Sequence, residues 1–187
     1  IEAVETNINP DSAYLAGIRA RAEHHWTGNI GVMLGVNDIL GDNWTGAERP
    51  ANVGVMFDVG RKGWYANLAV DYKTSSESGT FRGSEVDGSI TELDLGFRMH
   101  LDDEVVPLKA YLGAGIALLE AELDIDGSTL TSSDTGYWIN AGLYYRYQQR
   151  WNMGMDLRYS SAIQGFEDND QLSPSHFTYG VFLGYHF

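Results

Sequence analysis

Apolar and other side chains alternate along the chain at every second position in eight separate segments. The last segment shows it most clearly: Phe177, Tyr179, Val181, Leu183, Tyr185 and Phe187 alternate with Thr178, Gly180, Phe182, Gly184 and His186. Because successive side chains of a β-strand point to opposite faces, one face of this segment is wholly apolar. The same alternation occurs in residues 29–37, 52–59, 64–73, 92–101, 108–119, 137–146 and 151–160. The pattern therefore predicts eight strands.

The connections between these expected strands alternate in length. Residues 60–63, 100–107 and 148–150 are short connections, whereas residues 38–50, 74–88, 122–135 and 162–175 are long and polar. Short turns at one end, long loops at the other, an even number of strands and aromatic residues at both ends of the apolar faces are typical of outer-membrane barrels. The expected fold is an all-β, antiparallel, up-and-down transmembrane β-barrel over residues 29–187.

A soluble lipocalin-like or avidin-like barrel is the alternative, with the same alternation but with the apolar side chains inside. The apolar set here is rich in Trp, Tyr and Phe, which have too much volume for the lumen of an eight-stranded barrel. A transmembrane helix is not expected, because the longest apolar run, residues 112–119, is short and contains Gly113 and Gly115. No signal peptide is visible at Ile1, so we expect a mature or a non-exported chain.

Residues 1–28 form an N-terminal extension that has two interpretations. Asp11 and Ser12, followed by mostly apolar residues, fit an N-capped amphipathic helix or a plug. The same stretch also alternates like a membrane strand with Arg19 and Arg21 on its polar face, which would make it an additional strand.

Charge is strongly unbalanced over the whole chain. The 12 Lys and Arg face 26 Asp and Glu, a formal net charge of −14, which excludes nucleic acid as a partner because a phosphate-binding surface must be basic. The four long loops contribute −2, −2, −4 and −3 in chain order. Cysteine is absent, which excludes thiolate zinc sites and cysteine nucleophiles, and no cofactor is expected.

Ten charged residues fall on the polar faces of the expected strands, and their charges sum to zero. They are Asp58, Asp71, Lys73, Glu92, Asp94, Arg98, Lys109, Arg146, Asp156 and Arg158. Ionised groups that share a narrow interior must pair, because an isolated buried ion is very costly. We therefore expect a salt-bridged core, and the alternative is a gated polar path in which ion pairs change partners. Trp138 and Tyr144 face the same way and would narrow any pore.

The acidic loops have a simple interpretation as solvated outer surface. A more specific one is divalent-cation binding, since Asp124 and Asp126 stand two residues apart before Gly127, although the terminal Glu of a calcium loop is missing. A third interpretation is that divalent cations bridge the loops to anionic lipopolysaccharide.

Several short motifs resemble a known superfamily. Residues 108–116, LKAYLGAGI, resemble a strand of the small outer-membrane barrels, which include the outer-membrane protein A-like, opacity-like and W-like proteins. Gly96-Phe97-Arg98 and the terminal Gly184-Tyr185-His186-Phe187 are similar as well. The resemblance covers about residues 29–187 and implies fold and membrane rather than activity. It implies the bacterial outer membrane as location, its lipid and lipopolysaccharide as partners, and a C-terminal strand that the barrel assembly machinery reads.

One enzymatic branch also resembles this chain. Arg158-Tyr159-Ser160-Ser161-Ala162 is similar to the H-Y-S-N-A segment of lipid A 3-O-deacylases, whose His and Ser are catalytic. Ser160 matches the serine, but Arg158 stands at the histidine position and cannot act as a general base at neutral pH. We expect no enzymatic activity, and we expect His100, His176 and His186 to serve in aromatic belts or in packing.

The favoured function is a structural or interaction role in the outer membrane, with a charge-paired lumen and acidic loops outside the cell. The first alternative is a small passive channel for ions or apolar solutes, as in W-like barrels. The second is a lipid A-modifying enzyme.

Overall fold

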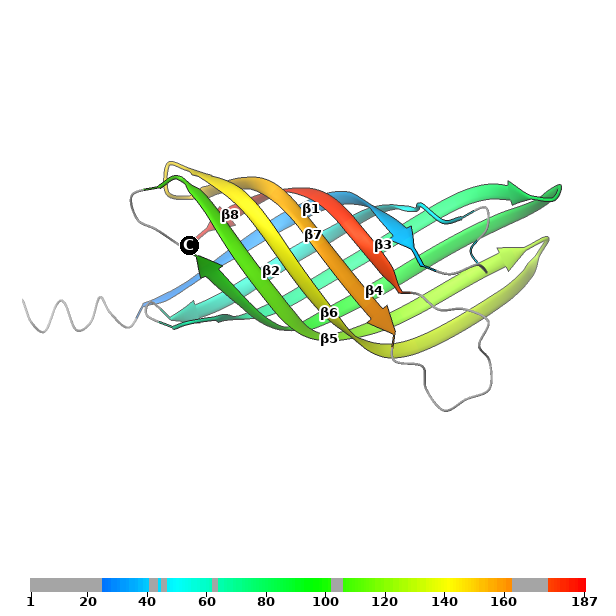
Figure 1. The fold of residues 1–187 in the computed structure, drawn as a ribbon, viewed down its shortest axis with the longest axis horizontal. Coiled ribbons are helices and arrows are strands. Elements are labelled where there is room, and N and C mark those ends of the chain that lie inside the picture. Colours follow the sequence, from blue (N-terminus) through cyan, green and yellow to red (C-terminus); the bar gives the residue numbers. More distant parts are fainter. Residues whose placement is uncertain (1–24, 41–43, 45–46, 62–63, 102–105, 163–174) are drawn as a thin grey trace, which may run out of the picture.

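Eight antiparallel strands close into a single barrel in chain order, with β8 pairing back to β1 (Figure 1). The computed structural model describes residues 25–40, 44, 47–61, 64–101, 106–162 and 175–187. Its strands are β1 (Trp26–Ile39), β2 (Ala51–Arg61), β3 (Asn67–Phe81), β4 (Ser84–Leu101), β5 (Leu108–Ile125), β6 (Ser128–Tyr147), β7 (Trp151–Ala162) and β8 (His176–His186). The prediction of an eight-stranded up-and-down barrel is confirmed.

Apolar side chains cover the outside of the barrel wall. In β1, Val32 and Leu34 are 53% and 59% exposed, whereas Met33 between them is fully buried. Corresponding exposed positions on the other strands include Val53, Leu68, Phe97, Leu112, Leu143, Met155 and Val181. Water disfavours such a surface by about 25 cal/mol for each Å² of apolar area, whereas lipid chains do not. The arrangement is the reverse of a soluble barrel.

Two connections that were expected to be long polar loops, residues 74–88 and 122–135, are strands, so that prediction was wrong. β3 and β4 stay paired up to a tight turn at Arg82 and Gly83, and β5 and β6 up to one at Asp126 and Gly127. All four turn residues have positive φ, of 52°, 93°, 50° and 81°. Two consecutive residues with positive φ make the turn that matches the twist of paired strands.

The phase of the alternation explains the error. Along β5, apolar residues point outward as far as Leu118, and from Leu119 onward they point inward while the outward positions become acidic. β4 inverts in the same way, with Val86 and Ile90 buried and Leu93 and Leu95 facing outward. Where a strand passes from lipid into water, its outward side chains change from apolar to polar, and its apolar side chains then face inward. The strands expected from the sequence included only the segments with apolar residues on the outer face. Each expected strand therefore ended where the apolar residues change to the inner face.

The two long hairpins project past the rest of the barrel (Figure 1). β2 pairs with β3 only as far as Ser76, and β7 pairs with β6 only as far as Gly136. Residues 77–91 and 119–135 therefore form a four-stranded extension of the wall, which we call the protruding sheet. The end of the barrel that carries it is the hairpin end, and the opposite end is the turn end.

Smaller differences concern the strand limits. The barrel begins at Trp26 rather than at residue 29, because Gly28 and Phe187 exchange two backbone hydrogen bonds of 3.1 and 3.0 Å. The third strand begins at Asn67 rather than at Trp64. Both interpretations of the N-terminal extension concern residues outside the described part of the chain. No helix in the described part is long and apolar enough to cross a membrane.

Candidate functional site

A belt of charged side chains crosses the middle of the lumen, and we call it the ionic belt. Asp71 of β3 and Asp94 of β4 stand directly opposite one another, a pairing of like charges that is unfavourable unless cations lie between them. Arg158 of β7 is fully buried and contacts both carboxylates, and its Nε lies 3.7 Å from Oδ1 of Asp156. Arg98 of β4 donates from Nη2 to Oδ2 of Asp71 at 2.6 Å. The belt thus ties β3 and β4 to β7 across the barrel.

The belt continues toward the hairpin end through Lys73 and Glu92. These are opposite partners on β3 and β4, with Nζ 2.9 Å from Oε2 of Glu92 and 3.6 Å from Oδ2 of Asp94. Glu92 also accepts a hydrogen bond from Oγ of Ser160 at 2.6 Å, and its Oε2 lies 3.1 Å from Nε2 of His176. Every one of these side chains is buried, so the pairing is shielded from water.

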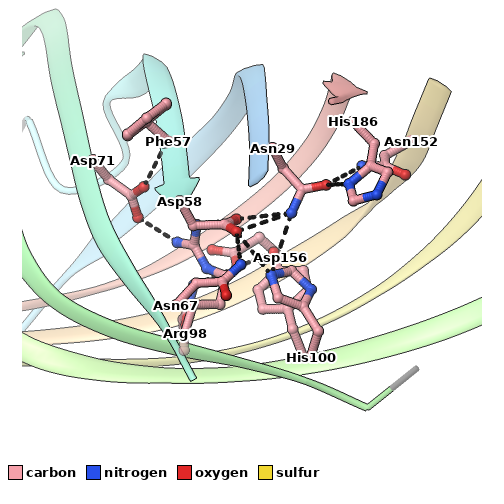
Figure 2. A network of polar contacts seen from close by, with 12 residues as sticks. Asn29, Phe57, Asp58, Asn67, Asp71, Arg98, His100, Asn152, Asp156 and His186 are labelled. Carbon is pink, nitrogen blue, oxygen red and sulfur yellow. Dashed lines mark hydrogen bonds and ion pairs between the residues drawn. The ribbon is translucent and has the colours of Figure 1, made fainter. Parts of the chain in front are cut away.

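A second polar cluster surrounds Asp58 at the turn end, as Figure 2 shows. Its carboxylate accepts hydrogen bonds from Nδ2 of Asn29 at 2.9 Å and from Nδ2 of Asn67 at 2.6 Å. Nη1 of Arg98 lies 3.5 Å from Oδ2 and Nε2 of His100 lies 3.2 Å from Oδ1. Because Arg98 contacts Asp71 as well, this cluster and the belt form one continuous network.

Asn29 carries the cluster to the last strands. Its Oδ1 accepts from Nδ2 of Asn152 at 2.9 Å and lies 2.9 Å from Nδ1 of His186. Arg146 donates to Oδ1 of Asn152 at 2.9 Å and to the hydroxyl of Tyr144 at 3.1 Å. Side chains of β1, β6, β7 and β8 therefore meet in the turn-end opening.

A cavity of about 30 Å³ lies beside this cluster. Its lining includes the polar residues Asp58, Arg98 and His100 and the apolar residues Met56 and Phe182. A buried water needs roughly 10–15 Å³ on this measure, so the space suits about two water molecules.

An apolar cluster closes the hairpin end of the lumen, and we call it the apolar cap. Trp44, from the connection between β1 and β2, is fully buried within it. The other members are Ile39, Ala47, Ala69, Val86, Ile90, Ala117, Leu119, Ala121, Leu123 and Trp138. Gly88 makes room for the indole, since a Cβ at this position would lie 3.0 Å from Cζ3 of Trp44. Trp138 joins the cap to the belt, because its ring centre lies 4.9 Å from the guanidinium carbon of Arg158.

The structure places the charged residues singled out from the sequence as follows. Asp58, Asp71, Lys73, Glu92, Asp94, Arg98, Asp156 and Arg158 take part in the ion pairs given above. Lys109 is buried on the inner face of β5, and Arg146 is part-buried at the turn end.

His100 and His176 do not lie in aromatic belts, so that part of the expectation was wrong, whereas His100 does pack against the rings of Tyr111 and Tyr144. Both imidazoles approach carboxylates inside the barrel, His100 that of Asp58 and His176 that of Glu92. The sequence alone could have placed both imidazoles inside the barrel, because residues two apart on a strand share a face. His100 thus shares a face with Arg98, and His176 shares one with Thr178.

Both carboxylates of the suggested cation loop accept hydrogen bonds from other residues of the two hairpins. Asp124 accepts from the backbone N–H of Gly127 at 2.8 Å and from the hydroxyl of Thr129 at 2.9 Å. Asp126 accepts from the backbone N–H of Glu85 at 3.2 Å, which links the two hairpin turns. Within the described ranges, no group of three or more His, Asp or Glu is arranged to hold a metal ion.

A closed barrel with an apolar exterior and a filled, charge-paired interior defines the class of integral membrane β-barrels. The chain belongs to the outer membrane protein β-barrel domain family, whose family model matches residues 6–187. No curated protein sequence matches the chain.

Solved structures show the same fold. OprG of Pseudomonas aeruginosa is similar with a TM-score of 0.63 at 13% identity, over 88% of this chain and 97% of that one. Neisserial surface protein A is similar with a TM-score of 0.58 at 15% identity, over 86% and 95%. Ail, the attachment invasion locus protein of Yersinia pestis, is similar with a TM-score of 0.57 at 14% identity, over 88% and 99%. These neighbours are small outer-membrane barrels, and at such identities they establish the fold.

Proposed function

We propose that this protein is a non-conducting barrel of the bacterial outer membrane that acts through its protruding sheet, outside the cell. The observation that carries this proposal is the filled lumen. The apolar cap, the ionic belt and the Asp58 cluster follow one another along the axis, and the cavity beside the last of these suits only about two waters. A barrel with a filled lumen acts through its outer surface and not through a pore.

The channel alternative requires ion pairs that separate readily. Arg158 contacts three carboxylates in a fully buried site, and removing one partner of such a buried pair costs about 3–5 kcal/mol. An opening of that cost would be rarely populated, since about 1.4 kcal/mol corresponds to a factor of ten. The belt therefore supports a structural role for the lumen charges.

The enzyme alternative requires a serine that lipid can reach. Ser160 is fully buried, faces the lumen and donates its hydroxyl hydrogen to Glu92. A donor to a carboxylate inside the barrel is not placed to attack an acyl chain outside it. We therefore assign no catalytic role to Ser160.

The protruding sheet is strongly acidic and rich in hydroxyl groups. It contains eight acidic residues, Glu77, Glu85, Asp87, Glu120, Glu122, Asp124, Asp126 and Asp134, and one basic residue, Arg82. On β6 its outward positions include Thr129, Thr131 and Ser133, all exposed. A paired, acidic sheet that stands clear of the membrane suits recognition of a cationic partner.

Surface labelling of intact bacteria tests the orientation. A short epitope inserted between Arg82 and Gly83 should bind antibody on intact cells, whereas the same epitope between Gln148 and Gln149 should bind only after the outer membrane is permeabilised. Both insertions fall in exposed turns with positive φ, which tolerate extra residues. Binding at the second site alone on intact cells would contradict the proposal.

A further inference from the structure

β6 has an open edge where it leaves the barrel. β7 pairs with β6 only as far as Gly136, and no described residue pairs with residues 128–135 on that side. The N–H of Arg146, an even-numbered residue of β6, bonds to the carbonyl of Pro107 on the side of β5 at 3.0 Å. Hydrogen-bonding direction alternates along a strand, so the N–H and C=O groups of Thr129, Thr131 and Ser133 point away from β5. They form a row of donors and acceptors toward the open side that no other described residue pairs with as a strand.

Most of the usual protections of an edge strand are missing from this segment, whose one charged residue is Asp134 on the inner face. Natural proteins guard exposed edges with lysine, proline, a bulge or a short strand. Residues 128–135 read STLTSSDT, with no lysine or proline, and the register against β5 is continuous from Ser128 to Tyr145, without a bulge. At about 3.4 Å per residue the open edge extends roughly 27 Å, enough for a full additional strand.

The opposite edge of the protruding sheet is less open. Only residues 77–81 of β3 extend past the last pair with β2. The connection from β1 also reaches this edge, because the backbone N–H of Arg49 donates to Oε2 of Glu77 at 2.6 Å. The longer edge, on β6, is the better docking site.

The two faces beside the β6 edge differ in chemistry. On the outer face, Glu120, Glu122 and Asp124 project from the neighbouring β5 in a single column. On the inner face Leu130 is 43% exposed, which leaves an apolar contact next to the edge. A strand added here would place alternate side chains on these two faces, cationic toward the carboxylates and apolar toward Leu130.

We propose that the open edge of β6 binds an extended segment of a partner protein by strand addition, the segment alternating basic and apolar residues. The proposal rests on the proposed function, since the partner must reach the sheet from outside the cell. A second copy of this chain fits the edge poorly, because it would bring an equally acidic sheet against the first.

The test uses the full chain in lipid nanodiscs and a ten-residue peptide of alternating lysine and valine as probe. Backbone amides of Thr129, Thr131 and Ser133 should exchange hydrogen quickly in the free protein and become protected when the peptide binds. The same peptide with every backbone amide N-methylated should not bind, and a glutamate–valine peptide should not bind either. These peptides test the proposal on the unaltered protein.

Variants at one position separate the backbone from the side chain. Thr131→Pro removes an N–H from the open edge and leaves the ladder to β5 intact, so the variant should fold and bind the peptide at least about fivefold more weakly. Thr131→Val keeps the N–H and should bind within about twofold of the wild type. Glu122→Gln should weaken binding about two- to fourfold and reduce its dependence on salt.

Three results would overturn the proposal: equal binding by Thr131→Pro and Thr131→Val, protection of the edge amides without peptide, and a dimer in solution that Thr131→Pro dissociates. The last two would mean that another segment of the chain or a second copy occupies the edge. Because peptide binding in nanodiscs does not depend on orientation in the cell, failure of this test differs from failure of the epitope test.

Discussion

Replacing Arg158 by Met should destabilise the barrel strongly. The guanidinium is fully buried and contacts Asp71, Asp94 and Asp156, so its loss leaves carboxylates inside the barrel with fewer cations. Removing one partner of a buried ion pair costs about 3–5 kcal/mol, a large part of the total stability of a typical domain. We expect the free energy of unfolding to fall by an amount in this range, or the variant to fail to insert.

The matched control is Arg49→Met at the rim. Arg49 also pairs with a carboxylate, that of Asp38 at 3.5 Å, but its side chain is 72% exposed. Such a pair is worth under about 1 kcal/mol, so this variant should unfold close to the wild type. The double variant Arg158→Met with Asp94→Asn removes the carboxylate of Asp94 together with the guanidinium. It should regain at least about half of the stability lost in Arg158→Met.

Urea unfolding in phospholipid vesicles, followed by tryptophan fluorescence and by migration of unboiled samples in gels, measures all three variants against the wild type. A loss below about 1 kcal/mol for Arg158→Met would refute the reasoning, since it would mean that the carboxylates do not depend on this cation. If the double variant regained no stability, the loss in Arg158→Met could not be attributed to the carboxylates left without a cation.

Three further predictions concern other parts of the lumen and the hairpins. Trp44→Ala should lower the free energy of unfolding by about 3 kcal/mol, because it empties the apolar cap around a fully buried indole, and urea titration measures this. Gly142→Ala should destabilise by about 1–3 kcal/mol, because the added Cβ would overlap the ring of Tyr111, whose hydroxyl donates to Asp156 at 2.6 Å, and urea titration measures this as well. Calcium should leave the thermal midpoint unchanged, because Asp124 and Asp126 are held by hydrogen bonds within the hairpins, and a calcium-dependent rise in scanning calorimetry would contradict this.

The alternation of side chains was sufficient to predict the barrel and its polar interior. A strand in lipid must show a single apolar face, and this signal repeats in all eight strands. The pairing of Arg158 with Asp71 and Asp94 could not be predicted in the same way, because it joins β7 to β3 and β4 across the lumen. Contacts of that kind depend on register and strand tilt, which no single strand encodes.

One signal for a hairpin was present in the sequence and was not used. Asp126-Gly127 is a strong marker of a two-residue hairpin turn, but it was interpreted through its resemblance to a calcium loop. The burial of Trp44 is different in kind, since one indole within a polar connection carries no periodicity. Its place becomes apparent only when Val86, Ile90 and Leu123 are seen to face the same space.

Single-channel recording in planar lipid bilayers tests the central claim, a lumen closed by the ionic belt and the apolar cap. The wild-type barrel should show no unitary conductance steps over long recordings in concentrated potassium chloride. Reproducible steps that disappear when Arg98 or Asp94 is replaced would contradict the account, because they would show that ions pass through the belt.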